Sequence, residues 1–205
     1  QFIGTCGSID SRPDSDLMVP MGDQQGAPAL EVFDPLCPTC RAFEQRLKSS
    51  GLDKKLARKA VMFPLDKSCN WMLDRQVHAG ACAVSEAVLC AGSRADEVVD
   101  WAFEHQSEIR SAAEGQPDAA RRMVEQAFPE LERCVGSPEV QTRLNRSLRW
   151  AVKQEIKVLT PQLYVDGVRL CDEDVDLGLE YALTRMIRRQ RNGTLVAQPA
   201  EGDDS

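Results

Sequence analysis

Aromatic residues make up only 5% of this 205-residue chain, and basic residues are outnumbered by acidic ones. Nucleic-acid binding needs basic side chains that neutralise phosphates, and often aromatic rings that stack on bases. With 25 Lys and Arg against 32 Asp and Glu, the formal net charge at pH 7 is −7. The composition therefore argues against nucleic acid as a partner.

Long hydrophobic runs are also missing, and Ala60–Phe63 is typical of the longest ones. A helix that crosses a bilayer needs about 20 apolar residues, so we expect no membrane span in this chain. The segment Gln1–Cys6 is too short for a signal peptide. We expect a soluble domain that is either mature or excised from a longer protein.

Cysteine, in contrast, is abundant and even in number. The eight cysteines are Cys6, Cys37, Cys40, Cys69, Cys82, Cys90, Cys134 and Cys171. Such usage is typical of secreted or periplasmic proteins with disulfides. The alternative is a reduced, cytosolic protein in which some thiols are buried as small apolar groups. We expect a periplasmic or other extracytoplasmic location.

The chain divides into segments by composition. Residues 1–14 and 193–205 are rich in small and polar residues and are predicted to be flexible. Leu17–Met21 is a short apolar run containing Pro20, which favours an edge strand. The strand and helix signals divide the rest into a first half at 15–66, a helical insertion at 67–156 and a second half at 157–192.

Strand signals flank the helical insertion. Ala29–Leu36 and Ala60–Phe63 are predicted strands, and Gln162–Val165 with Val168–Cys171 predicts a hairpin around Asp166-Gly167. Helices are predicted at 38–50, 81–91, 93–109, 117–128 and 138–156, and after the hairpin. This order indicates an α/β fold with one small mixed sheet covered by helices.

Cys37-Pro38-Thr39-Cys40 follows the first predicted strand and opens a helix. Proline is favoured in the first helical turn, so Cys37 is the expected N-cap at an exposed tip, while Cys40 faces inward. A thiolate at a helix N-terminus is stabilised by free N–H groups and by the helix dipole. Cys37 is therefore the candidate nucleophile and Cys40 the candidate resolving thiol of a disulfide exchange.

Two other interpretations of this motif remain open. A zinc half-site would need a second Cys-x-x-Cys or a His pair, and the sequence has neither. A purely structural disulfide is the other alternative, although a strand-to-helix junction is an exposed place for one. We expect no metal and no cofactor.

The arrangement resembles the thioredoxin fold in its DsbA-like form. The resemblance rests on Leu30-Glu31-Val32-Phe33-Asp34 before the cysteine motif and on Thr160-Pro161-Gln162-Leu163-Tyr164-Val165-Asp166-Gly167 after the insertion. It implies a thioredoxin fold with a helical insertion lobe and thiol:disulfide exchange with protein clients that carry thiols or disulfides.

Three residues gain roles through this resemblance. It implies that Pro161 follows a cis peptide bond beside the cysteines, and that the backbone of Thr160 pairs with a client segment. It also implies that Glu31 is a partly buried carboxylate that assists proton transfer as Cys40 reacts; the alternative is an exposed acid at a strand edge. Thr39 departs from the pattern, because strong oxidases of this family carry His there, and the direction of the reaction therefore stays open.

A narrower resemblance points to a partner. Cys69-Asn70, His78-Ala79-Gly80-Ala81-Cys82 and Leu170-Cys171-Asp172-Glu173-Asp174 resemble DsbA-like domains fused to bacterial vitamin K epoxide reductase homologues. This resemblance implies a membrane-embedded redox partner and a full-length protein that is tethered to the membrane. It also implies that the membrane-embedded domain was cut away near Gln1–Cys6.

The remaining cysteines and histidines are expected to be structural. Cys82 and Cys90 lie about 12 Å apart along one helix and cannot bond each other, and Cys69 with Cys82 is the preferred pair. His78 and His105 are expected in a loop and on a helix face rather than in catalysis. The prediction is a thiol:disulfide oxidoreductase; the alternative is a non-catalytic, redox-sensitive module that binds thiol clients or a soft metal.

Overall fold

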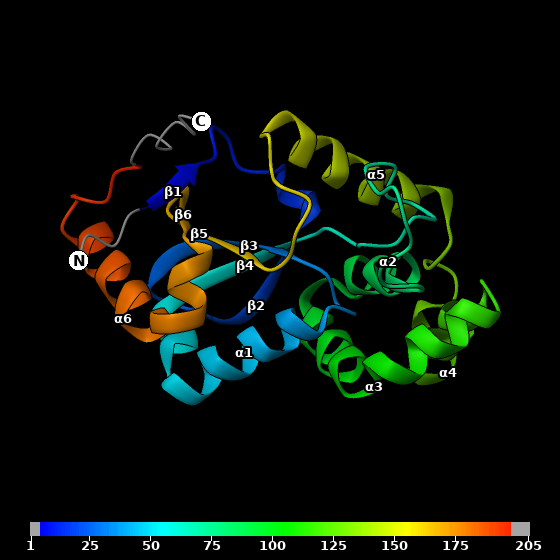
Figure 1. Ribbon diagram of the computed structural model, residues 1–205. Coiled ribbons are helices and arrows are strands. Elements are labelled where there is room, and N and C mark those ends of the chain that lie inside the picture. The colour runs from blue at the N-terminus through cyan, green and yellow to red at the C-terminus, as the bar shows by residue number, and fades with distance from the viewer. Residues whose placement is uncertain (1–4, 198–205) are drawn as a thin grey trace.

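The computed structural model describes residues 5–197 and has a six-stranded mixed sheet in the order β1-β6-β5-β3-β4-β2 (Figure 1). The strands are β1 (Thr5–Ser8), β2 (Met18–Gln24), β3 (Ala27–Phe33), β4 (Leu56–Met62), β5 (Gln162–Val165) and β6 (Val168–Leu170). Strands β3 and β4 are parallel, and every other described pair is antiparallel. The two predicted central strands and the hairpin are confirmed, whereas residues 1–4 and 198–205 lie outside the described part of the chain.

Helices cover both faces of this sheet. They are α1 (Pro38–Ser50), α2 (Ala81–Ala91), α3 (Ala95–Gly115), α4 (Ala119–Ala127), α5 (Pro138–Lys153) and α6 (Asp172–Arg191). Apolar residues of α1 and α6 share one core with β3 and β5, while α5 packs on the opposite face against Leu30 and Val61. None of the described helices is long and apolar enough to cross a membrane.

Helices α2, α3 and α4 form a lobe beside the sheet, where Figure 1 shows them next to the start of α1. Their buried residues form one cluster with Val19 and Met21 of the edge strand β2 and with both motif cysteines. The helical insertion is therefore present as predicted, but α3 begins later than expected and runs on to Gly115, past the predicted end at residue 109. Arg94 is its N-cap, because residues Gly92–Arg94 form a short 3-10 turn in place of a cap at Ser93.

The N-terminal segment differs from the prediction. Composition indicated a flexible stretch over residues 1–14, but Thr5–Ser8 pairs with β6 at the sheet edge. Cys6 is joined to Cys171 across this pair by a disulfide, an interaction with a partner 165 residues away. No local pattern in the sequence reveals such a partner. The predicted edge strand near Pro20 is confirmed as β2.

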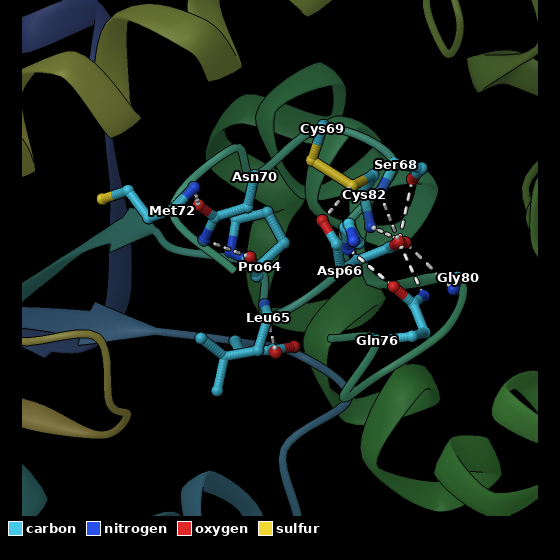
Figure 2. Close-up of a disulfide and its surroundings, with 12 residues drawn as sticks. Pro64, Leu65, Asp66, Ser68, Cys69, Asn70, Met72, Gln76, Gly80 and Cys82 are labelled. Atoms are coloured by element: carbon cyan, nitrogen blue, oxygen red, sulfur yellow. Dashed lines mark hydrogen bonds between the residues drawn. A yellow bond between two sulfur atoms is a disulfide. The ribbon is translucent and has the colours of Figure 1, made fainter. Parts of the chain in front are cut away.

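Two further disulfides lie in the helical lobe, and one of them is the preferred pair Cys69–Cys82. Figure 2 shows Asp66 beside this bond, with hydrogen bonds to Ser68, Gln76 and Gly80. These contacts hold the irregular segment between β4 and α2. The third disulfide joins Cys90 to Cys134, which confirms that Cys82 and Cys90 have separate partners.

We expect the two lobe disulfides to contribute unequally to stability. Replacing Cys90 and Cys134 together with Ser should lower the free energy of unfolding by about 4 kcal/mol, because the bond closes a long loop in the unfolded chain. The same change at Cys69 and Cys82 should cost about 3 kcal/mol from the shorter loop. Equilibrium denaturation of both variants measures the difference, and the reverse order would contradict the loop-entropy explanation.

Candidate active site

The motif cysteines lie where β3 passes into α1. Cys37 is the N-cap of α1 and Pro38 the first helical residue, as predicted, and the backbone N–H of Cys37 bonds to the carbonyl of Asp34. Both thiols are free, and Cys40 is inaccessible. The prediction that Cys37 lies at an exposed tip is wrong, because its exposed fraction is only 4%.

Two segments distant in sequence cover Cys37. Gln106 of α3 is itself buried, and its side-chain amide donates hydrogen bonds to the carbonyls of Cys37 and Pro35, at 3.0 and 3.1 Å. On another side, the Cys37 sulfur lies 3.7 Å from the carbonyl oxygen of Thr160. The peptide bond between Thr160 and Pro161 is cis. The structure thus brings Thr160 to Cys37. Gln106 was not predicted, because nothing in the helical pattern around it indicates that its side chain bonds to Cys37.

The two thiols have opposite electrostatic environments. A hydrogen bond from Cys40, followed by weaker contributions that include one from Thr160, lowers the pKa of Cys37 to about 5 despite the cost of burial. Burial, with the nearby Cys37 as a second cause, raises the pKa of Cys40 well above its usual value. Cys37 is therefore the thiolate at neutral pH, and Cys40 keeps its proton.

A histidine that sequence reasoning set aside lies at this site. His78 is in the irregular segment before α2, as expected, but its Nδ1 lies 2.7 Å from Oδ2 of the buried Asp34. Asp34 also accepts the backbone N–H groups of Leu36 and Leu65. The sequence contains one signal for Asp34, because it is a polar residue between a strand and the cysteine motif. It contains no comparable signal for His78.

Glu31 lies in β3 and is fully buried, so the alternative of an exposed acid is wrong. Arg58 of β4 donates to Glu31 and, through both terminal nitrogens, to Glu44 of α1. Burial raises the pKa of Glu31 to about 7, although the charge of Arg58 opposes this shift. Glu44 follows Cys40 by one turn of α1, so Arg58 links the Glu31 carboxyl to α1 one turn after Cys40.

The described residues contain no group of three or more His, Cys, Asp or Glu side chains arranged to hold a metal ion. The chemistry that the arrangement allows is that of a paired thiolate and thiol. Cys37 can attack or leave a sulfur centre, and Cys40 lies one helical turn deeper, in position to close a disulfide with it.

We expect the reactivity of Cys37 to follow its thiolate. In the reduced protein, iodoacetamide should modify Cys37 first, with a rate that rises with pH around a midpoint of about 5, because the alkylating species is the deprotonated form. Mass spectrometry of the alkylated peptides over a pH series measures both the order of labelling and the pH midpoint of its rate. A Cys37→Ser variant serves as the control, and preferential labelling of Cys40 would reverse the assignment.

No family model and no curated protein matches this sequence. Solved structures do match it. The oxidoreductase NmDsbA1 from N. meningitidis has a TM-score of 0.59 at 15% identity, over 89% of this chain and 98% of that one.

Two other structures are similar over most of their length. The oxidoreductase DsbA from Xylella fastidiosa has a TM-score of 0.55 at 18% identity, over 85% of this chain and 91% of that one. The alpha-DsbA1 of Wolbachia pipientis has a TM-score of 0.58 at 9% identity, over 87% and 94%. The chain therefore has the DsbA-like thioredoxin fold with a helical insertion, as the resemblance implied.

Proposed function

We propose that the protein is a thiol:disulfide oxidoreductase that exchanges disulfides with protein clients through Cys37 and Cys40. The observation that carries this proposal is the asymmetric pair itself. A thiolate at a helix N-cap stands in front of a buried, protonated thiol one turn deeper, beside the carbonyl of Thr160. The similar structures described as oxidoreductases support it through their fold.

In the exchange, the client thiolate attacks the Cys37 sulfur of the oxidised protein. The Cys37–Cys40 bond breaks, Cys40 leaves and takes up a proton, and a mixed disulfide forms. A second thiolate of the client then attacks the client sulfur of the mixed disulfide. A disulfide forms within the client, and Cys37 leaves as a thiolate. Because the stabilised Cys37 thiolate is a good leaving group and favours the reduced protein, we assign the oxidising direction.

The substrate-positioning role belongs to Thr160 and Pro161 in this proposal. Thr160 lies next to the Cys37 sulfur, and a client strand that pairs with its backbone would hold the client sulfur near Cys37. Pro161 follows in the same loop and leads directly into β5, which is hydrogen-bonded to β3. The loop is thus anchored to the strand that leads into α1.

Replacing Cys40 with Ser should trap clients as mixed disulfides on Cys37, because the resolving thiol is lost. Non-reducing electrophoresis after incubation with a disulfide-containing client measures the adducts, and the Cys37→Ser and Cys40→Ser double variant is the control. Failure to trap any client, together with no turnover in a dithiol–disulfide assay, would favour the alternative of a non-catalytic module that binds thiol clients or a soft metal.

Glu31 is proposed as the proton acceptor when Cys40 becomes a nucleophile. Its burial and its link through Arg58 to Glu44, one turn of α1 after Cys40, support the role, and its pKa of about 7 allows proton exchange near neutral pH. Since a carboxyl accepts a proton only when ionised, the rate of mixed-disulfide resolution should rise as pH increases through about 7.

We expect Glu31→Gln to slow this resolution by roughly tenfold or more and to flatten its pH dependence, because proton transfer loses its acceptor. Stopped-flow measurement of mixed-disulfide decay tests it. Glu44→Gln is the matched control, since Glu44 binds the same Arg58. Equal slowing by both variants would show that the charge balance at Arg58, and not Glu31 itself, sets the rate.

An oxidising, periplasmic compartment is proposed because three disulfides join six of the eight cysteines. The electron acceptor is proposed to be a membrane protein of the vitamin K epoxide reductase type, to which the protein is tethered in its full-length form. The support is the resemblance of the segments around Cys69, His78 and Cys171. Reoxidation of the reduced domain by such a reductase in detergent would test this partner.

A further inference from the structure

The side chains of His78 and Asp34 form a buried contact that the cysteine motif itself does not include. The Asp34 side chain is fully buried, and that of His78 keeps 10% of its surface exposed. All three described donors to Asp34 are N–H groups, two from the backbone and one from the His78 ring. The ring is the one partner among them that can carry a full positive charge.

Asp34 is close to both reactive sulfurs. Its backbone carbonyl accepts the N–H of Cys37, and a backbone hydrogen bond also joins it to Cys40. Its charge acts on both cysteines and disfavours a thiolate at either one. An unpaired carboxylate at this position would therefore oppose the state in which Cys37 reacts.

We propose that His78 is a positioning residue of the redox centre: its protonated ring pairs with Asp34 and cancels the negative charge that this carboxylate would otherwise present to the Cys37 thiolate. The inference rests on the proposed thiol:disulfide exchange and deepens it. It gives the Cys37 thiolate a positively charged neighbour in a chain that has the neutral residue Thr39 between its two motif cysteines. His78 takes no part in bond making, and its charge acts on the thiolate together with that of Asp34.

The backbone fixes this pairing. The N–H of His78 donates to the carbonyl of Leu65 at 2.7 Å, and the N–H of Leu65 donates to Oδ2 of Asp34 at 2.9 Å. Two residues after His78, Gly80 is bound by Asp66, next to the Cys69–Cys82 disulfide (Figure 2). The ring therefore extends from a segment that is held on both sides of it.

Charged groups from three elements face His78. Burial lowers its pKa, but the hydrogen bond and charge of Asp34 at the end of β3, together with the charge of Cys37 at the start of α1, raise the pKa overall. Arg110 of α3 opposes this effect. Since the thiolate favours the protonated ring, the protonated ring must favour the thiolate by the same free energy.

His78→Asn tests the charge while keeping a donor near Asp34. We expect the midpoint of Cys37 alkylation to rise by roughly one pH unit. The equilibrium with glutathione should shift about tenfold toward the Cys37–Cys40 disulfide, because the reduced form loses that much thiolate stabilisation. His105→Asn is the matched control, since His105 lies on α3 and bonds to the Trp101 carbonyl. An unchanged midpoint in His78→Asn would overturn the proposal.

The double variant Asp34→Asn with His78→Asn tests whether the Asp34 charge is what the ring cancels. If it is, removing both groups should return the Cys37 midpoint to near the wild-type value. A double variant that stays shifted as far as His78→Asn would show that the Asp34 charge has no part in the shift, and the proposal would be wrong.

The wild-type protein offers a measurement that needs no variant to fold. The imidazole titration of His78, followed by NMR, should have a higher midpoint in the reduced protein than in the oxidised one, because only the reduced protein has the thiolate. Equal midpoints would overturn the proposal. If wild-type Cys37 exchanges with glutathione normally in these samples, such a result leaves the proposed function intact; if it does not exchange at all, the proposed function itself fails.

Discussion

One buried carboxylate, that of Asp34, determines how three segments meet at the cysteines. It accepts hydrogen bonds from Leu36 in the turn before α1, from Leu65 after β4 and from His78 before α2. A buried donor or acceptor left without its partner costs about 1–3 kcal/mol, and more when it is charged. Shifting any of the three segments would incur that cost, so the start of α1, and with it Cys37, is held relative to the lobe.

Both motif cysteines are buried, but their surroundings shift the pKa values of the two thiols in opposite directions. Removal from water raises the pKa of a thiol, and this effect dominates at Cys40. At Cys37 the hydrogen bond from Cys40 and further interactions, including one with Thr160, outweigh it. The same contact thus lowers one pKa and raises the other. The position of the two cysteines on the helix predicts which thiol has the lower pKa, but it does not predict that Gln106 and Thr160 cover Cys37.

The features that the sequence predicted correctly are those set by local interactions. Pro38 after Cys37 marks a helix start, and Asp166-Gly167 marks a two-residue turn, wherever the rest of the chain lies. The Cys69–Cys82 bond also closes a short loop. The β1 strand, in contrast, depends on β6 and on Cys171, some 165 residues away. The burial of Cys37 and the contact of His78 with Asp34 likewise depend on tertiary partners, which a single sequence does not identify.

Two buried carboxyl groups near α1 have partners of different kinds, and this gives the centre a defined response to pH. Glu31 is paired with Arg58, which stays charged, so its own carboxyl titrates, with a pKa of about 7. Asp34 lies beside His78, and its hydrogen bond and charge raise the pKa of that ring against the effect of burial. As pH falls, protonation of Glu31 and of His78 makes the surroundings of α1 less negative. Less negative surroundings favour the Cys37 thiolate, so the protonation of these groups opposes the loss of that thiolate on acidification. Cys37 must therefore titrate as a member of a coupled set and not as an isolated thiol.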